Sequence, residues 1–412
     1  MPEDSKNLDR RGFISASLGC LAAGVAAATP VSLLAQSDTA KKSTGPTTRK
    51  SGGVITRTLG RTGITVPIVG MGVMNSNNPE VVQASYEIGV RHFDTAAAYQ
   101  YGRNEQMVGN VIKKLGVRDK VIIATKEPRP NRTSGMTDKQ VKQEVYELCN
   151  GSLKRLKSDY VDILYFHNVR QAEDFNDPVL MEAMADLKKQ GKVRAVGVST
   201  HAAMADVVNA VAEGGFYDVV LTAINVSMAD DVDLHKAIAN AAKKGVGIIA
   251  MKTQAGGNRL PNPDSLKDYS GSVIATASLK WVLQNPNITA AIPGYVNFQH
   301  MKEDFSVAGG LEYTDEEQKF LGDNRISLGL AFCRQCGKCE PTCPHKVDIP
   351  SLMRTHMYAA QYANFHEARA TLDAIARDRG IAACNSCSDC SARCAHYVDI
   401  AKRIDNLKAM YA

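Results

Sequence analysis

The sequence has no long run of like charge and no strongly apolar segment, and both absences limit what the chain can do. Its 49 Lys and Arg and 43 Asp and Glu give a formal net charge of +6 that is spread along the chain. A nucleic-acid or lipid surface needs clustered basic residues, so we predict no nucleic-acid partner. The least polar stretch, residues 12–37, contains Gly, Pro, Ser and Thr, and it is too weakly hydrophobic to predict a stable membrane span.

Other motifs are missing as well. No Gly-x-Gly-x-x-Gly follows the first predicted strand, which argues against an open, doubly wound dinucleotide-binding sheet. No flavin-binding signature is visible. No heptad repeat indicates a coiled coil, so the oligomeric state cannot be deduced.

Cysteine, by contrast, is concentrated near the C-terminus, where eight of the ten form two runs of the same spacing. In each run three closely spaced cysteines are followed by a fourth after three residues, which is typical of [4Fe-4S] ligation. In two-cluster ferredoxins the fourth Cys of each run binds the other cluster. The predicted ligand sets are Cys333, Cys336, Cys339 and Cys394 for one cluster, and Cys384, Cys387, Cys390 and Cys343 for the other. Zinc sites and disulfides are less favoured alternatives, because zinc sites usually show two Cys-x-x-Cys pairs and disulfide frameworks are scattered.

The two runs are halves of an internal repeat. The segment Cys-Pro-His-Lys-Val-Asp-Ile at 343–349 returns as Cys-Ala-His-Tyr-Val-Asp-Ile at 394–400. Ala395 replaces the expected second proline, which puts the local turn in doubt. Between the runs, residues 350–381 show helical spacing of apolar residues. Residues 325–412 therefore resemble the mainly α-helical two-cluster ferredoxin modules of redox enzymes.

The N-terminus resembles a twin-arginine export signal. Arg10 and Arg11 precede the uncharged stretch, which ends near Ala35. Twin-arginine transport carries folded proteins, which suits a protein that must acquire its clusters before export. We therefore expect a signal peptide at residues 1–35, a flexible linker at 36–53, and a periplasmic or exported protein.

Between residues 54 and 324, short β-rich runs alternate with helical patterns, which is the signature of βα repeats. Eight repeats in this length predict an α/β fold, a TIM (β/α)8 barrel, better than an open sheet. The predicted strands are residues 68–72, 91–94, 121–125, 161–166, 193–198, 219–223, 246–250 and 290–292.

Three successive predicted strands end in polar residues that could share one rim of the barrel. Asp94 ends the second strand and Tyr99 follows it closely, Lys126 comes directly after the third, and His167 after the fourth. Active sites of TIM barrels lie at the carboxyl ends of the strands. Each residue alone could be a cap, a packing ring or a solvated side chain, but four at matching strand ends indicate a catalytic site.

These motifs resemble those of the aldo-keto reductases over residues 54–324. The resemblance is carried by residues 57–66, 89–99, 102–109, 159–167, 247–252 and 281–286. It implies that Tyr99 is the general acid and base of hydride transfer between a carbonyl and an alcohol. Lys126 is expected to lower the pKa of Tyr99, Asp94 to hold Lys126, and His167 to orient the substrate carbonyl.

The family binds NADP(H), and the corresponding candidates here are Gly72, Ser199, Thr200, Lys252 and Gly294. Several usual cofactor contacts are changed, since Thr200 stands for Asn and no Lys or Arg follows the eighth strand. A preference for NADP is therefore not supported. Because the periplasm offers no free nicotinamide pool, any NAD(P)(H) would have to be tightly bound before export.

Two hypotheses of different classes follow. The first is an exported oxidoreductase that acts on a carbonyl or alcohol, for example a sugar-like one, and exchanges electrons through its clusters with an external redox partner. Polar residues at 75–78, 168–176 and 254–263 favour a hydroxylated substrate. The second is an iron-sulfur electron-transfer protein whose barrel is a partner-binding scaffold, and a hydro-lyase is a more distant third.

Overall fold

The computed structural model describes residues 46–130, 135–255, 267–323, 332–387 and 389–411. All described residues belong to the second of two units of the chain, which spans residues 45–412. The predicted signal peptide at 1–35 and most of the predicted linker lie outside the described residues. Within the described residues, no helix has the length and apolar character needed to cross a membrane.

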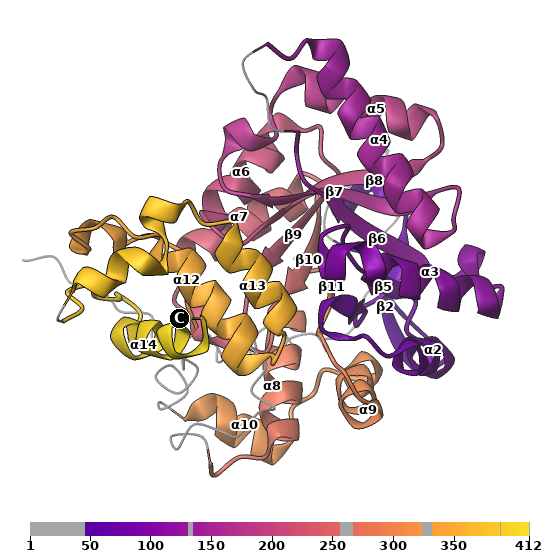
Figure 1. Cartoon of the computed structure of the whole chain (residues 1–412). Coiled ribbons are helices and arrows are strands. Elements are labelled where there is room, and N and C mark those ends of the chain that lie inside the picture. The colour runs from indigo at the N-terminus through magenta and orange to yellow at the C-terminus, as the bar shows by residue number, and fades with distance from the viewer. Residues whose placement is uncertain (1–45, 131–134, 256–266, 324–331, 388, 412) are drawn as a thin grey trace, which may run out of the picture. The chain divides into compact units, whose positions relative to one another are not determined.

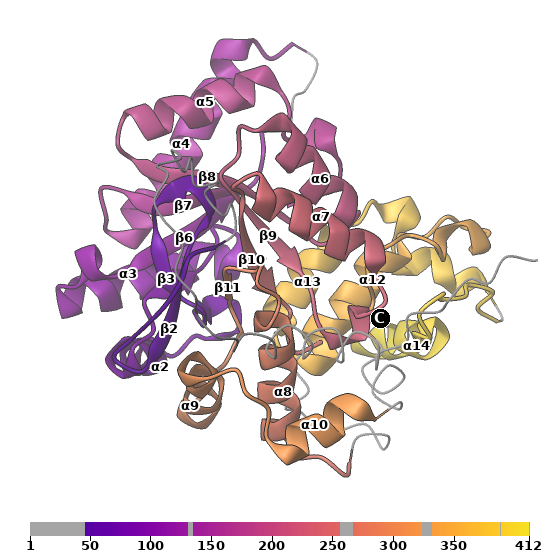
Figure 2. The ribbon, with the colours of Figure 1, turned by 180° about the vertical axis from the view of Figure 1, so that it is seen from behind.

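The second unit begins with a small antiparallel sheet of β1 (Thr48–Ser51), β2 (Val54–Thr58) and β3 (Thr65–Pro67). β1 lies within the segment that we expected to be a flexible linker, and this part of the prediction was wrong. Its side chains are all exposed, and it is ordered by pairing its backbone with β2. β2 and β3 form the hairpin that the family resemblance implied, and Figure 2 shows both beside the barrel strands.

The turn of this hairpin closes the amino end of the barrel. Leu59 is fully buried, and Arg61 N donates to Gly245 O at 2.7 Å, just before a central strand begins. A Cβ added at Gly60 would come within 2.4 Å of that carbonyl oxygen, so only glycine allows this close approach.

Eight parallel strands form the barrel, and they confirm the predicted fold. They are β4 (Met71–Gly72), β5 (His92–Asp94), β6 (Ile122–Glu127), β7 (Val161–Val169), β8 (Val193–Thr200), β9 (Val219–Ala223), β10 (Gly247–Met251) and β11 (Ala290–Ala291). They are ordered sequentially from β4 to β11. A parallel bridge between Val69 and Ala291 joins the two ends, with Gly70 N donating to Ala291 O at 2.8 Å. The sheet is thus closed, and the carboxyl ends of all eight strands face one mouth.

Helices surround this sheet (Figure 1). They are α2 (Pro79–Ile88), α3 (Arg103–Leu115), α4 (Asp138–Leu156), α5 (Pro178–Lys189), α6 (Met204–Gly214), α7 (Val232–Lys243), α8 (Gly271–Leu283), α9 (Phe298–Ser306) and α10 (Asp315–Gly322). Side-chain caps fix where several of these helices begin. Thr137 and Gln140 form a capping box at α4, and Asp177 caps α5 one residue before Pro178.

The C-terminal domain is mainly helical, as predicted. Its helices are α12 (Ile349–His356), a π-helical turn (Met357–Gln361), α13 (Phe365–Asp373) and α14 (Ile400–Tyr411). The internal repeat is structural, because Lys346 and Tyr397, at equivalent positions, have φ angles of 51° and 61° before α12 and α14 begin. The turn is therefore the same in both halves, although Ala395 replaces proline in the second.

The C-terminal domain contacts loops that follow the barrel strands. Arg354 of α12 donates to Asn168 Oδ1 at 3.1 Å, and Asn364 donates to Asn75 Oδ1 at 3.0 Å. Arg334 also donates to Ser227 O, after β9, at 2.6 Å. These contacts place the domain over the carboxyl ends of the strands, where barrels carry their active sites.

Candidate functional site

The four residues of the predicted tetrad meet at the barrel mouth. Lys126 Nζ donates to Asp94 Oδ1, and to Thr95 O at 2.6 Å. The same ammonium lies 4.9 Å from the centre of the Tyr99 ring. The centre of the His167 ring lies 5.8 Å from the centre of the Tyr99 ring, and the two rings are edge-on. Asp94 and Lys126 are almost completely buried. The sequence placed these residues on separate strand ends, and the closed sheet brings them together.

Burial sets the protonation of this group. It raises the pKa of Tyr99 well above its ordinary value, and the nearby carboxylates of Asp94 and Glu367 add to the effect. In this unliganded site burial therefore outweighs any lowering of the Tyr99 pKa by Lys126, and that predicted role of Lys126 stays a prediction. Burial, with Lys126 and Arg354, lowers the pKa of His167 to about 3. At neutral pH the mouth thus presents a neutral phenol and a neutral imidazole.

A cavity of about 70 Å³ lies beside the tetrad. Three of the predicted cofactor contacts line it: Gly72, Lys252 and Gly294. The other two do not belong to its lining. Ser199 Oγ accepts from Asn168 N at 3.0 Å, and Thr200 Oγ1 donates to Val169 O at 2.8 Å. Their hydroxyls form hydrogen bonds with backbone groups near the ends of β7 and β8. No sequence pattern predicts such bonds.

The C-terminal domain completes this cavity, which the sequence did not predict. Tyr358 and Tyr362, from the π-helical turn and the residue after it, line it on the domain side. Lys252 Nζ donates to Tyr358 OH at 3.2 Å and lies 5.9 Å from the centre of the Tyr362 ring. In the sequence Tyr362 fitted a helical apolar pattern, so nothing distinguished it from a core residue.

His201 is a second residue that the sequence reading missed. It is 7% exposed and lines the tetrad cavity, and it follows β8 directly. Burial lowers its pKa well below the ordinary value, with Lys252 and Arg354 adding to the effect. His201 follows the end of a predicted barrel strand, as His167 does. The same sequence signal that indicated His167 therefore also indicates His201.

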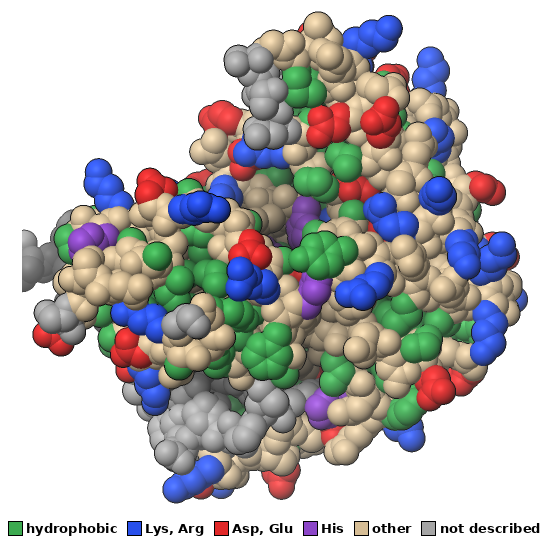
Figure 3. All heavy atoms as spheres, viewed as in Figure 1, with side chains coloured by type: hydrophobic (Ala, Val, Ile, Leu, Met, Phe, Trp, Pro, Cys, Tyr) green, Lys and Arg blue, Asp and Glu red, His purple; other side chains and the backbone are tan. Residues whose placement is uncertain are grey.

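A wider cleft of about 730 Å³ leads to the same region from outside. Its lining includes His167 and His201 of the barrel with Arg354 and Glu367 of the C-terminal domain. The face in Figure 3 is hollowed here, and histidine side chains lie in the hollow. The cleft can therefore admit a small molecule to the tetrad from the boundary between the two domains.

The second cysteine run lines a cavity of about 150 Å³ in the C-terminal domain. The thiols around it are Cys343, Cys384, Cys387 and Cys390, which is the crossed set predicted from the spacing. Lys408 Nζ donates to Cys384 O at 3.0 Å beside this cavity. Four thiols around one cavity suit the corners of a [4Fe-4S] cluster.

The first run shows the same crossed arrangement. Cys339 interacts electrostatically with Cys333, Cys336 and Cys394, and Cys333 interacts with Cys394. Gln335 Nε2 lies 3.3 Å from Cys333 Sγ, and His396 N lies 3.3 Å from Cys394 Sγ. No three His, Cys, Asp or Glu side chains among the described residues converge tightly enough for a single metal ion. A cubane spreads its ligands over four iron corners, so these thiols fit a cluster.

Comparison with known families identifies both parts of the chain. Residues 70–271 match the Aldo/keto reductase family, and residues 332–398 match the 4Fe-4S dicluster domain. The barrel is an aldo/keto reductase domain. The chain is thus an aldo-keto reductase-like oxidoreductase that carries an iron-sulfur domain over its barrel mouth.

Individual relatives agree with this assignment. An aldo-keto reductase, YhdN of Bacillus subtilis, is 35% identical over 125 residues, which cover 29% of this chain and 36% of that protein. L-galactose dehydrogenase of Arabidopsis thaliana is 27% identical over 302 residues, which cover 65% of this chain and 92% of that protein.

Solved structures share the fold of the barrel. The aldo-keto reductase AKR11C1 of Bacillus halodurans, in its holo form, has a TM-score of 0.52 and 21% identity, over 65% of this chain and 94% of that one. An aldo-keto reductase of Klebsiella pneumoniae in complex with NADPH has a TM-score of 0.50 and 22% identity, over 64% of this chain and 92% of that one.

Proposed function

We propose that the chain is an exported oxidoreductase that interconverts a carbonyl and an alcohol by hydride transfer from or to a tightly bound NAD(P)(H), with Tyr99 as the general acid and base. Two [4Fe-4S] clusters in the C-terminal domain pass electrons between the barrel and an external redox partner. The observation that carries this proposal is a single cavity lined by Asp94, Lys126 and Tyr99 of the barrel and by Tyr358 of the cluster domain. The tetrad and the iron-sulfur domain therefore share one cavity.

The geometry favours proton donation by Tyr99. Its raised pKa keeps the phenol protonated at neutral pH, so it can donate to a carbonyl oxygen held between Tyr99 and His167. The phenolate that remains lies beside the Lys126 ammonium, which offsets its charge. Asp94 fixes that ammonium in place. In the reverse reaction the phenolate of Tyr99 would accept the alcohol proton.

A whole nicotinamide dinucleotide does not fit the cavity as it stands. Its volume of about 70 Å³ is well below the roughly 300–1,000 Å³ of small-molecule and cofactor pockets. Two expected contacts, Ser199 and Thr200, bond to backbone groups instead. Binding of NAD(P)(H) would require Tyr358 and Tyr362 to leave the mouth. The NADPH complex of the Klebsiella relative is the reason to test for a tightly bound dinucleotide.

The cluster domain is placed to exchange electrons with the site. Each bound cluster would supply or accept one electron at a time. Cys333 lines a small pocket together with Lys252 and His201, which also line the tetrad cavity. The first cluster would therefore lie next to the barrel mouth. We expect an external redox partner to bind the exposed surface of the C-terminal domain that faces away from the barrel.

Replacement of Tyr99 by phenylalanine tests the catalytic proposal. Loss of the proton donor should lower turnover of a carbonyl substrate about 10²- to 10⁴-fold, as for other general acids. The control is Tyr101→Phe, two residues away on the same turn, because Tyr101 is 75% exposed. Iron content should stay unchanged in both variants. Turnover in Tyr99→Phe equal to that of Tyr101→Phe would rule out the role of Tyr99.

The structure also supports a second candidate, an electron-transfer protein whose barrel is a scaffold. The observation in its favour is that Tyr358 and Tyr362 narrow the mouth where a hydride carrier would sit. Under this alternative, protein purified from its native compartment holds no nicotinamide. Electron transfer to a partner would also survive Tyr99→Phe, whereas the first candidate predicts loss of carbonyl turnover.

We propose a hydroxylated, sugar-like substrate. Asn75 lines the tetrad cavity and Asn168 lines the wider cleft, so polar side chains do face the site. The segment at 256–263, also predicted to line it, lies outside the described residues. L-galactose dehydrogenase, a relative over most of its own length, acts on a sugar by its name.

Export remains a proposal that rests on the sequence. Arg10 and Arg11 precede a weakly apolar, uncharged stretch. Replacing both by lysine should keep the protein, with its clusters, inside the cell. Fractionation of cells that express either form would measure this, and equal periplasmic amounts would contradict the proposal.

A further inference from the structure

Two cations at the barrel mouth have no carboxylate partner among the described residues. Lys252, directly after β10, donates to Tyr358 OH at 3.2 Å, and Arg354 of α12 donates to Asn168 Oδ1 at 3.1 Å. The ion pairs between described residues include neither of them. Buried or half-buried cations are usually paired, so this pair calls for an anion.

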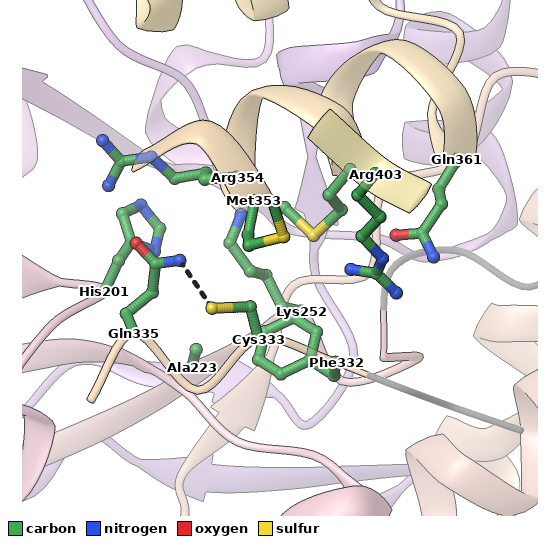
Figure 4. A pocket seen from close by; sticks show the side chains of 11 residues that line it. His201, Ala223, Lys252, Phe332, Cys333, Gln335, Met353, Arg354, Gln361 and Arg403 are labelled. Atoms are coloured by element: carbon green, nitrogen blue, oxygen red, sulfur yellow. Dashed lines mark hydrogen bonds between the residues drawn. The ribbon is translucent and has the colours of Figure 1, made fainter. Parts of the chain in front are cut away.

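His201 adds an unused polar atom at the same place. The side chain is 7% exposed, and no described residue forms a hydrogen bond with its Nδ1. It borders the tetrad cavity with Lys252, and it borders the wide cleft with Arg354. In Figure 4, His201 and Arg354 lie on one side of the small pocket, with Lys252 between them and Arg403. The three side chains thus surround the junction of the cavities.

The nearest anion of the protein itself, the first cluster, has other partners. Cys333 interacts with Arg403 and accepts a hydrogen bond from Gln335 Nε2. Lys252 and Arg354 line the same small pocket as Cys333, but within the described residues neither forms a hydrogen bond with its sulfur.

Glu367 of α13 lies near both cations but pairs with neither. It lines the cleft beside Arg354, yet it forms no ion pair with Arg354 or Lys252 within the described residues. Burial raises the pKa of Glu367, while Lys252 and Arg354 act in the opposite direction. Burial also lowers the pKa of Lys252 to about 7, so a bound carboxylate would help to keep this ammonium protonated.

We propose that Lys252, Arg354 and His201 bind the carboxylate of the substrate, and that its reacting carbon lies beside Tyr99. Arg354 can hold a planar carboxylate with two parallel hydrogen bonds, and Lys252 supplies a point charge. The inference rests on the proposed function and adds the substrate class, a hydroxy or keto acid. It also gives the cluster domain a part in substrate recognition, because Arg354 belongs to it.

Calorimetric titration of the full-length, cluster-loaded protein with glycolate tests the proposed carboxylate site. Ethylene glycol, which has the same two-carbon skeleton but no carboxylate, is the neutral comparison. Glycolate should bind at least tenfold more tightly than ethylene glycol. Arg354→Gln and Lys252→Met should each weaken glycolate binding about tenfold or more, because charge-assisted hydrogen bonds are lost. The control is Arg369→Gln, since Arg369 of α13 is exposed and pairs with Asp373.

Equal binding of the two probes, or glycolate binding that both variants retain, would overturn the inference. Inorganic phosphate that binds more tightly than glycolate, with the same dependence on Arg354, would overturn the carboxylate assignment. Visible absorption of the clusters confirms that each variant is folded. Since titration needs no turnover, the result is separate from the proposed reaction: glycolate that binds through Arg354 and Lys252 without being turned over would support this inference and contradict the proposed function.

Discussion

The barrel and the C-terminal domain are stabilised in different ways. The barrel has one continuous core, which runs from the hairpin residue Leu59 through all eight strands to α10. The C-terminal domain has a separate core of only ten buried residues among those described, one of which is the cluster ligand Cys339. Its Met357, Tyr358 and Ala359 belong instead to the barrel core. A small core cannot offset chain entropy alone, so this domain depends on its clusters and on the barrel.

The chain provides a separate probe for each region. Trp281, the only tryptophan, lies on α8 of the barrel, so its fluorescence reports barrel unfolding. The visible absorption of the clusters reports the C-terminal domain. Differences between the two signals measure how far the regions are independent.

The largest effect is expected from the cluster ligands. Cys343→Ser and Cys384→Ser should each lose the same cluster, because both thiols line one cavity, and iron should fall from about eight to about four atoms per chain. The double variant should lose no more iron than either single variant. The clusters' absorption should melt at a lower temperature while Trp281 fluorescence changes little.

Cys149→Ser is the control, since this buried thiol lies in α4 of the barrel. Iron content should be the same as in wild type. A further loss of iron in the double ligand variant would show that the two runs do not cross.

A pH-dependent effect is expected in the barrel. Burial raises the pKa of Glu127 from 4.5 to about 7. The folded state then holds a proton that the unfolded state releases, so Glu127 costs stability as the pH rises from about 4.5 to about 7. The Glu127→Gln variant has no titrating group at this position. Between pH 5 and pH 8 its free energy of unfolding should therefore rise by on the order of 2–3 kcal/mol relative to that of wild type.

Denaturant unfolding followed by Trp281 fluorescence at the two pH values measures this gain. Glu144→Gln, in the same cleft and with no described ion pair, is the control and should show no such difference. A constant difference between Glu127→Gln and wild type at both pH values would contradict the raised pKa.

The smallest effect is expected at the boundary between the regions. Asn364 caps α13 by accepting from Glu367 N at 3.0 Å, and it donates to Asn75 Oδ1 of the barrel at 3.0 Å. Asn364→Ala removes both bonds and should destabilise the C-terminal domain by about 1–2 kcal/mol. Asn364→Asp keeps the cap and removes the donor, so it should cost less.

Thermal melting of the cluster absorption measures this, with Trp281 fluorescence as the barrel reference. An equal loss in the two variants would assign the whole effect to the contact with Asn75. No loss in either would show that the two regions are not joined through this residue.

Predictions from the sequence succeeded where the signal was local. The strand and helix patterns gave the barrel. The cysteine spacing gave the crossed grouping of thiols around the cavity. The tetrad was found because Asp94, Lys126 and His167 end successive strands of a parallel barrel. Periodicity and spacing depend on nearby residues, which the sequence contains directly.

Other features depend on segments that are distant in the sequence. Lys126 was expected to lower the pKa of Tyr99, but burial dominates and the net shift is upward. Thr200 was a candidate cofactor contact, and its hydroxyl also donates to Val169 O. In both cases the missing information was the surroundings of the residue, not its identity.

The sequence by itself determined a closed barrel, a rim that carries Asp94, Lys126 and His167, and a tail that matches an iron-sulfur domain. Only the tertiary structure decided that this tail covers the rim. Lys252 meets Tyr358 across 106 residues, Arg354 meets Asn168 across 186, and Asn364 meets Asn75 across 289. Side chains so far apart in the chain share no local periodicity, so their contact depends on how the two cores pack.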